Sequence, residues 1–191
     1  MPLNLPNLVT LLRIALIPLI VGVFYLPDMW LSQEGKNFAA TGIFIVAALT
    51  DWLDGYLART LNQTSAFGAF LDPVADKLVV VGALIVLLTL GRVDMVVGLI
   101  IIGREIAISA LREWMAHIGA SRSVAVHMLG KVKTTVQMIA IPFLLYDGRL
   151  FGMMDTRVWG RWLIWIAAVL TIWSMIYYLQ KALPEIRAKA R

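Results

Sequence analysis

Six long apolar stretches divide the chain, at about residues 7–26, 38–58, 72–90, 93–116, 128–146 and 158–180. Each is far longer than a β-strand, and none shows the alternation of apolar and polar residues that is typical of strands. About 20 apolar residues are enough for a helix to cross a bilayer. The pattern therefore predicts an all-α integral membrane protein with six transmembrane helices.

Polar and turn-forming residues separate these stretches and leave little chain outside them. The separating segments are 27–28, 62–65, 91–92, 119–123 and 147–149. No repeat of fixed period and no low-complexity segment interrupts the pattern. We therefore expect a single membrane domain over residues 1–191.

The composition excludes a soluble domain. Of the 191 residues, 60% are hydrophobic and 15% are charged, and the mean hydropathy is +0.81. A typical soluble domain is about 45–50% apolar and about 25% charged. The absence of cysteine excludes disulfides, thiolate metal sites and cysteine nucleophiles. Because Arg13 lies inside the first apolar stretch and no basic segment precedes it, we expect that stretch to be a retained span and not a signal peptide.

The distribution of basic residues predicts the orientation of the helices. Six spans place both termini on one side of the membrane, and that side would hold twelve of the 17 basic residues. These are Arg13, Arg59, Lys77, Arg104, Arg112, Arg122, Lys131, Lys133, Lys181, Arg187, Lys189 and Arg191. Since cytoplasmic segments are enriched in Lys and Arg, both termini are predicted to be cytoplasmic. The net charge of +5 suits contact with anionic lipid headgroups, and no basic stripe on a soluble surface indicates nucleic acid.

Four aspartates lie where the second and third predicted helices approach the cytoplasmic side. Asp51 and Asp54 are three residues apart and Asp72 and Asp76 are four apart, so each pair occupies one helix face. A short connection joins the two helices, so we expect the pairs to face each other. A carboxylate at the centre of a membrane helix costs about 2.5–3.5 kcal/mol. A cluster of four therefore requires compensation.

Divalent cations would provide this compensation. Carboxylate oxygens without Cys or neighbouring His favour Mg²⁺, Mn²⁺ or Ca²⁺ over Zn²⁺. Four carboxylates exceed what one Mg²⁺ usually takes from a protein, and a pair of cations can clamp the attacking and leaving oxygens of a phosphoryl transfer. Gly55, Ala58 and Gly68 would leave room for a ligand or backbone to come close, and Arg59 offers a fork for phosphate.

Other interpretations of these charges remain open. The aspartates could form an interfacial acidic rim neutralised by Arg59 and Lys77, or the ion site of a cation carrier. The carrier interpretation is weakened because the two halves of the chain carry no matching acidic pair. Asp72 and Pro73 could simply begin a helix as N-cap and first helical residue. Arg13 could extend to the interface or enter the site.

A family signature covers the acidic segment. The residues Asp51, Asp54, Gly55, Ala58, Arg59, Gly68, Asp72 and Asp76 follow the pattern D-x2-D-G-x2-A-R-x8-G-x3-D-x3-D without a departure. With this signature the chain resembles the CDP-alcohol phosphotransferase family. Segments 1–13, 104–115 and 130–138 also resemble bacterial members that act on glycerol 3-phosphate, so the resemblance extends over most of the chain.

The resemblance implies a homodimeric enzyme in the bacterial cytoplasmic (inner) membrane, with its active site open to the cytoplasm. It assigns the four aspartates to two divalent cations, Mg²⁺ or Mn²⁺, and Asp76 also to the role of general base. The acceptor hydroxyl would attack the phosphorus that carries the diacylglycerol of CDP-diacylglycerol, and CMP would leave. The residues that would bind this donor are Asp51, Asp54, Gly55, Ala58, Arg59, Gly68 and Asp72.

A second cluster, of basic residues, bears on the acceptor. Arg104 and Arg112 are eight residues apart on similar helix faces, and Lys131 and Lys133 follow in the next predicted helix. Four cations near the metal site would suit an acceptor that carries its own phosphate, such as glycerol 3-phosphate. Positive-inside topology, with pairing of each arginine to the glutamate that follows it, would also explain them. Phosphatidylglycerol, inositol phosphate and serine remain alternative acceptors within the family.

Overall fold

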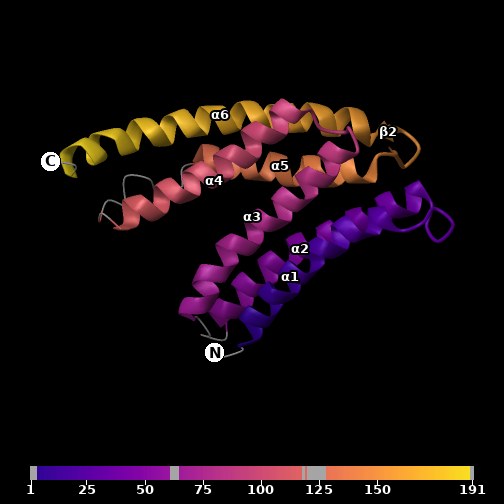
Figure 1. Ribbon diagram of the computed structural model, residues 1–191, viewed down its shortest axis with the longest axis horizontal. Helices are drawn as coiled ribbons and strands as arrows, with labels where there is room; N and C mark the ends of the chain where they lie inside the picture. The colour runs from indigo at the N-terminus through magenta and orange to yellow at the C-terminus, as the bar shows by residue number, and fades with distance from the viewer. Residues whose placement is uncertain (1–3, 61–64, 118, 120–127, 190–191) are drawn as a thin grey trace.

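Six long helices dominate the computed structural model, which describes residues 4–60, 65–117, 119 and 128–189 (Figure 1). The elements are α1 (Leu5–Gly22), the 3₁₀ turn η1 (Val23–Tyr25), α2 (Gln33–Thr60), α3 (Ala66–Thr89), α4 (Met95–His117), α5 (Met128–Tyr146), β1 (Arg149–Leu150), β2 (Met154–Asp155) and α6 (Thr156–Lys189). All six predicted helices are present. The short antiparallel hairpin β1–β2 was not predicted, because two-residue strands leave no periodic signal in a sequence.

Several helices extend beyond their apolar stretches. Ser65 is the N-cap of α3, and its hydroxyl accepts a hydrogen bond from the backbone N–H of Gly68 at 3.0 Å. Helix α3 therefore begins at Ala66, and Asp72 and Pro73 lie inside it. The interpretation in which Asp72 and Pro73 begin this helix is wrong. The cap stabilises the first turn of α3 because it satisfies an amide that would otherwise lack a partner.

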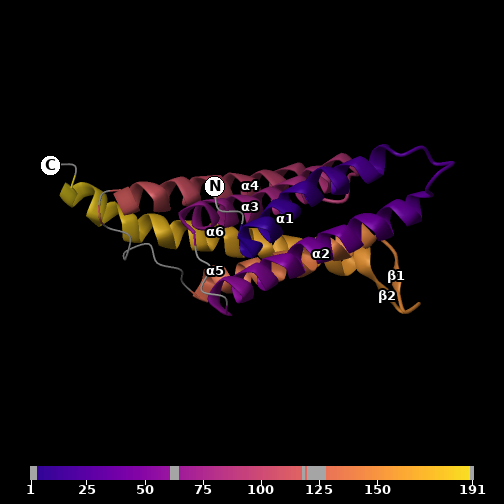
Figure 2. The same cartoon turned by 90° about the horizontal axis from the view of Figure 1, so that it is seen from below.

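Helix α1 lies between α2 and α3. It packs against both, whereas direct contact between α2 and α3 is sparse, and α5 packs most extensively against α6. Figure 2 shows α2 and α5 on one side of the molecule, α3 and α4 on the other, and α1 between them. The acidic residues of α2 and α3 therefore face a third helix as well as each other.

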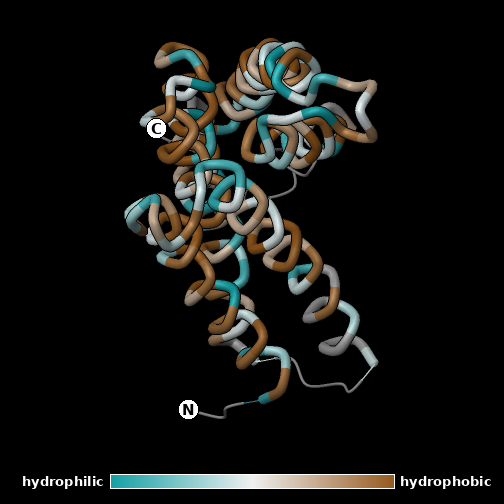
Figure 3. Tube along the Cα trace, turned by 90° about the vertical axis from the view of Figure 1, so that its right-hand side faces the viewer, coloured by the Kyte–Doolittle hydropathy of each residue, from teal (hydrophilic) through white to brown (hydrophobic). Residues whose placement is uncertain are grey.

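Small and branched apolar side chains fill the main core. Ala40, Ala47, Ala75 and Ala83 are fully or almost fully buried, which lets neighbouring helix backbones approach closely. Large apolar side chains also cover the outside, including Leu99, Ile106 and Val169. Apolar residues run along all six helices (Figure 3). An apolar exterior of this kind is expected where lipid replaces water as the solvent.

Two segments of the described chain are long and apolar enough to cross a membrane. They are Leu5–Tyr25, with a mean hydropathy of 2.3, and Thr156–Ile186, with a mean hydropathy of 1.8. The charged residues of the predicted site lie in the four helices between them. The structure therefore shows a helical protein with membrane-compatible segments.

An arginine holds together the end of the molecule that carries the hairpin. Arg92 is buried between α3 and α4 and donates to the carbonyls of Leu144 (3.1 Å) and Leu145 (2.8 Å) and to Oδ1 of Asn37 (2.7 Å). It also forms an ion pair of 3.2 Å with the buried Asp147. Burial lowers the pKa of the Arg92 guanidinium, and Asp147 opposes that shift. One side chain thus joins α2, α5 and the α3–α4 connection.

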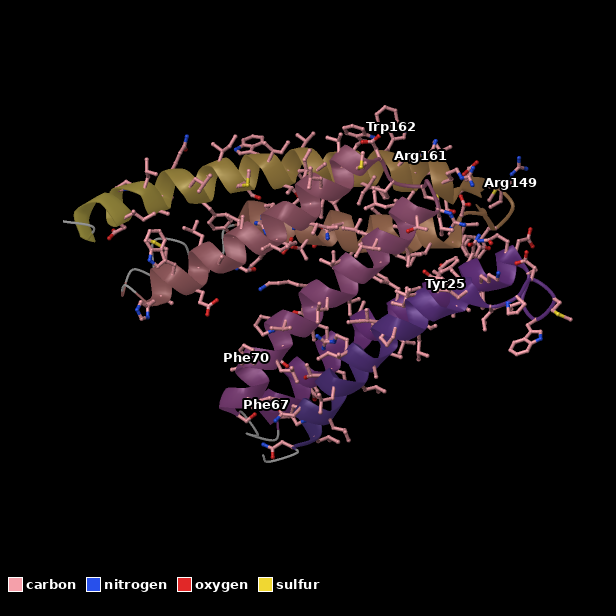
Figure 4. All side chains as sticks on the ribbon, in the orientation of Figure 1. Tyr25, Phe67, Phe70, Arg149, Arg161 and Trp162 are labelled. Atoms are coloured by element: carbon pink, nitrogen blue, oxygen red, sulfur yellow. The ribbon has the colours of Figure 1, made fainter. Side chains whose placement is uncertain are left out.

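Aromatic side chains mark both ends of the helices. Phe67 and Phe70 lie near the amino-terminal end of α3, whereas Tyr25, Arg149, Arg161 and Trp162 lie toward the hairpin end (Figure 4). Tyr25, Phe70 and Trp162 are largely exposed. Aromatic and basic side chains in such positions are typical of membrane–water interfaces.

Candidate active site

One polar face of α1 is directed at the acidic residues. Asn7, Thr10 and Arg13 are spaced three residues apart and are all buried. The Arg13 guanidinium is 1% exposed, so it does not extend to the interface. Of the two possibilities for Arg13, the structure favours entry into the site.

Arg13 brings two of the four aspartates together. Its Nη1 donates to Oδ1 of Asp51 in α2 at 3.0 Å and to Oδ1 of Asp76 in α3. The Asp51 and Asp76 side chains are 49% and 47% exposed, so both remain accessible from the space that they line. One cationic nitrogen therefore bridges two carboxylates that are 25 residues apart in sequence and lie in different helices.

The third aspartate is held by the same helix. The Thr10 hydroxyl donates to Oδ1 of Asp72 at 2.8 Å. One turn before Asp72 in α3, Gly68 lies against α1, and a Cβ atom at Gly68 would come within 2.5 Å of Oδ1 of Asn7. Asn7 in turn donates to Oγ of Ser65 at 2.9 Å. The motif glycine therefore permits the close approach that aligns α1 with Asp72 and Asp76.

Four motif residues can be placed only by their backbone. Asp54, Gly55, Ala58 and Arg59 lie in α2, and their side chains are outside the described part of the structure. Their assignment to metal or donor binding stays a prediction. Asp51 lies one helical turn before Asp54, so the backbone keeps both on neighbouring positions of one face.

The described carboxylates fit a divalent metal by their chemistry and direction. Asp51 and Asp76 present oxygen ligands that converge on a single positively charged nitrogen, and Asp72 is one turn from Asp76. Oxygen-only donor sets suit hard cations such as Mg²⁺ and Mn²⁺. Among the residues whose side chains are described, no three acidic or histidine groups lie together in a metal-binding arrangement, and Asp54 is not among those residues.

Asp51 and Asp76 line a cavity of about 130 Å³. Arg13 and Lys77 contribute positive charge to its wall, and Lys133 and Gln137 reach it from α5. Lys133 is buried and paired with Glu105 of α4. This cavity thus combines the carboxylates of the motif with cations from three helices.

The predicted acceptor-binding cations divide between two cavities. Arg104, Arg112 and Lys131 line a second cavity of about 400 Å³, whereas Lys133 lines the cavity of Asp51 and Asp76. Lys131 and Lys133 are two residues apart in a helix, so their side chains leave it in different directions. The structure therefore separates Lys133 from the other three members of the predicted set.

Glu105 and Thr134 lie between the two cavities, because both residues line each of them. Glu105 contacts Arg104 at 3.4 Å and also pairs with Lys133. The sequence indicated a pairing of Glu105 with Arg104 but gave no sign of its pairing with Lys133. Glu105 lies in α4 and Lys133 lies in α5, so only the folded structure reveals that Glu105 contacts both Arg104 and Lys133.

Carboxylates and cations line two adjoining cavities in a helical protein with membrane-compatible segments, which places the protein in the class of membrane-associated helical proteins. The chain belongs to the CDP-alcohol phosphatidyltransferase family, whose model matches residues 3–173. Members of this family generally use a divalent metal. Family membership favours the metal-site interpretation of the aspartates over an acidic rim or a cation carrier.

Relatives from several bacteria match nearly the whole chain. The chain is 49% identical over 190 residues to a CDP-diacylglycerol–glycerol-3-phosphate 3-phosphatidyltransferase of Escherichia coli (strain K12), covering 95% of this chain and 96% of the relative. Proteins of the same name from Shigella flexneri and Shigella boydii match with the same identity and coverage. The range matched by the family model, residues 3–173, spans the aspartate motif and the residues that line both cavities.

Proposed function

We propose that this protein transfers the phosphatidyl group of CDP-diacylglycerol to sn-glycerol 3-phosphate and releases CMP. The observation that carries this proposal is the 49% identity, over 95% of the chain, to a relative named for that reaction. The two adjoining cavities support it, because one contains carboxylates of the motif and the other contains more cations than carboxylates. The product would be phosphatidylglycerophosphate, a precursor in phospholipid synthesis.

The aspartate motif would bind the donor and the metal. Asp51, Asp54, Asp72 and Asp76 would hold two divalent cations, Mg²⁺ or Mn²⁺. When bound, such cations neutralise charge on the diphosphate and make its phosphorus more electrophilic. Asp51, Asp54, Gly55, Ala58, Arg59, Gly68 and Asp72 would bind the CDP portion of CDP-diacylglycerol.

Asp76 would act as the general base. It would accept the proton of the acceptor's primary hydroxyl as that oxygen forms a bond to the phosphorus bearing the diacylglycerol. The bond between this phosphorus and the CMP oxygen would break, and CMP would leave with the electron pair. Arg13 orients the Asp76 carboxylate by donating to its Oδ1. Thr10 does the same for Asp72, and Arg13 also donates to Asp51, so α1 holds three members of the motif.

The cations of α4 and α5 would bind the acceptor. Arg104, Arg112 and Lys131 line one cavity and would hold the phosphate of glycerol 3-phosphate. Lys133 lies in the adjoining cavity with Asp76, where it would contact the glycerol portion or the transferred phosphate. Because Glu105 and Thr134 line both cavities, an acceptor held by the arginines would lie next to the cavity of Asp76.

The distribution of basic residues bears on the membrane arrangement. We propose six transmembrane helices, both termini in the cytoplasm, an active site that faces the cytoplasm, and a homodimer in the bacterial inner membrane. The positive-inside distribution supports this orientation. The end of the molecule with α3's first turns would then face the cytoplasm, and the hairpin end would face the opposite side.

A panel of acceptors tests the reaction. Purified full-length protein in detergent is incubated with CDP-diacylglycerol, Mg²⁺ or Mn²⁺, and one of glycerol 3-phosphate, phosphatidylglycerol, inositol phosphate or serine, and CMP is measured. Release that depends on glycerol 3-phosphate is the expected result. Release without an acceptor, or only with another member of the panel, would contradict the proposal. A chelator should abolish release, and added Mg²⁺ or Mn²⁺ should restore it.

The role of Asp76 is tested with Asp76→Asn, which keeps the shape of the side chain but cannot take up a proton at neutral pH. We expect CMP release to fall by about 10²–10⁴-fold, the usual contribution of a general base. Asp94→Asn is the matched control, because Asp94 lies at the hairpin end and, among the described residues, its carboxylate accepts from the backbone N–H of Val96 at 2.8 Å and pairs with no cation. Asparagine is an equally good cap, so the control should keep full activity.

A further inference from the structure

Tyr178 of α6 contacts both arginines of the acceptor cavity. The guanidinium carbon of Arg104 lies over its ring at 5.7 Å from the centroid, and that of Arg112 lies over it at 5.2 Å. Nη2 of Arg112 also donates to the Tyr178 hydroxyl at 3.1 Å. The tyrosine is 1% exposed, so its position is determined by packing and not by solvent.

A second residue of α6 supports the same arrangement. Ser174 lies one turn before Tyr178 and accepts from Nη2 of Arg104 at 3.3 Å. Ile108, Met115 and Ala182 pack with Tyr178 in a separate apolar cluster of buried residues. The positions of both arginines of α4 are therefore set by a face of α6 that has no charge of its own.

The hydroxyl of Tyr178 also lies against α5. A Cβ atom at Gly130 would be 3.2 Å from this hydroxyl, and Gly130 lines the acceptor cavity. A Cβ atom at position 130 would therefore be in tight contact with this hydroxyl. Tyr178 therefore lies where α4, α5 and α6 meet, directly behind the cavity wall.

Two neighbouring guanidinium groups repel each other unless something between them compensates. The electron-rich ring face attracts both cations, and the hydroxyl accepts from one of them. In the described part of the structure, the buried Nε–H groups of Arg104 and Arg112 have no hydrogen-bond partner. Buried donors without partners are costly, and the two guanidinium groups that carry them both line the acceptor cavity.

We infer that Tyr178 is a positioning residue that holds Arg104 and Arg112 at the spacing required for the acceptor's phosphate. This inference rests on the proposed function and adds to it a residue of α6 outside the aspartate motif and outside the predicted basic set. Tyr178 sets the affinity for the acceptor and leaves donor binding unaffected, because it contacts neither Asp51 nor Asp76.

Steady-state kinetics of full-length Tyr178→Phe and Tyr178→Leu test this role. Phenylalanine keeps the ring and removes the hydroxyl, and we expect the KM for glycerol 3-phosphate to rise about fivefold, the effect of one hydrogen bond. Leucine also removes the ring, and we expect a rise of about 30-fold or more. The KM for CDP-diacylglycerol should stay within about twofold for both variants.

Tyr177 supplies the matched control. It neighbours Tyr178 in an edge-to-face contact, with ring centroids 6.0 Å apart, and its own ring lies beside Lys181. Tyr177→Phe and Tyr177→Leu should change neither KM. An unchanged KM for glycerol 3-phosphate in the Tyr178 variants would overturn the inference. Equal rises in both KM values would also overturn it, because they would indicate a merely structural role.

Thermal protection by inorganic phosphate separates this inference from the proposed reaction. Inorganic phosphate carries only the anionic part of the acceptor, so its protection of the protein against thermal unfolding needs no turnover. Wild-type protein should be protected, and Tyr178→Phe should require about fivefold more phosphate for the same protection. If the wild type fails to use glycerol 3-phosphate but this shift is seen, the proposed reaction fails and the role of Tyr178 stands. If the shift is absent, the role of Tyr178 fails.

Discussion

Replacement of Arg92 by methionine should destabilise the protein without changing its substrate affinity. Methionine keeps much of the length and apolar volume of the side chain but donates no hydrogen bond. The carbonyls of Leu144 and Leu145 and the Oδ1 of Asn37 would each lose a donor. Asp147 would lose one of its two arginines and keep Arg157, whose Nη2 donates to Asp147 Oδ2 at 2.6 Å.

The magnitude follows from these contacts. A buried acceptor left without a donor costs about 1–3 kcal/mol. Asn37 Oδ1 keeps the donor Nε2 of Gln33 at 3.1 Å, so the carbonyls of Leu144 and Leu145 are the two acceptors left without one, and they set a range of about 2–6 kcal/mol. Contacts that share one side chain are not additive, and loss of one partner from a buried ion pair costs about 3–5 kcal/mol in all. We expect a loss of about 3–5 kcal/mol, which for a chain of this size lowers the unfolding temperature by about 6–20 °C.

Thermal unfolding in detergent, followed by tryptophan fluorescence, measures this loss. Arg161→Met is the matched control, because Arg161 lies at the same end, is exposed, and makes no ion pair with the described residues. The control should change the free energy of unfolding by less than about 0.5 kcal/mol. Arg92→Lys keeps the charge without the fork and should fall between the two. A result for Arg92→Met within about 1 kcal/mol of the wild type would refute the reasoning.

Three further variants test how α1 and α3 assemble the site. Gly68→Ala should cost about 1–3 kcal/mol of stability, because the added Cβ atom would overlap with Asn7. In unfolding measurements, a second change, Asn7→Ala, should recover part of this loss. Additive losses would argue against the close approach. Ser65→Ala should cost about 1 kcal/mol through loss of the α3 cap, whereas Ser65→Asp should keep that stability. Thr10→Val should lower kcat/KM for CDP-diacylglycerol about tenfold through loss of the hydrogen bond to Asp72. The control Thr41→Val removes a hydrogen bond to the carbonyl of Asn37 in its own helix and should leave kcat/KM unchanged.

The helices could be predicted from the sequence because their signal is local. Apolar stretches of the required length recur six times, and the fifth, 128–146, coincides with α5. The start of α3 was misplaced by six residues, because Asp72 and Pro73 look like the N-cap and first residue of a helix, although the apolar residues 66–71 precede them. There the cap by Ser65, and not hydrophobicity, determines where the helix begins.

The acidic and basic clusters were also predictable, since charged residues inside apolar helices are costly and therefore conspicuous. Their pairing was not. Arg13 had two possible fates, and only the position of α1 between α2 and α3 directs it to Asp51 and Asp76. In the same way, the packing of α6 against α4 brings Tyr178 to Arg104 and Arg112, 66 or more residues away in sequence.

The sequence by itself determined the number and type of helices, the positive-inside charge distribution and the two clusters of charge that require partners. The tertiary structure decided which helix supplies each partner, which of two cavities Lys133 enters, and that Arg92 joins three elements at the end away from the aspartates. Helical periodicity relates residues on one face of one helix. The order in which helices pack depends on small residues and close approaches between distant segments, such as Gly68 against Asn7, and local pattern carries no record of those contacts.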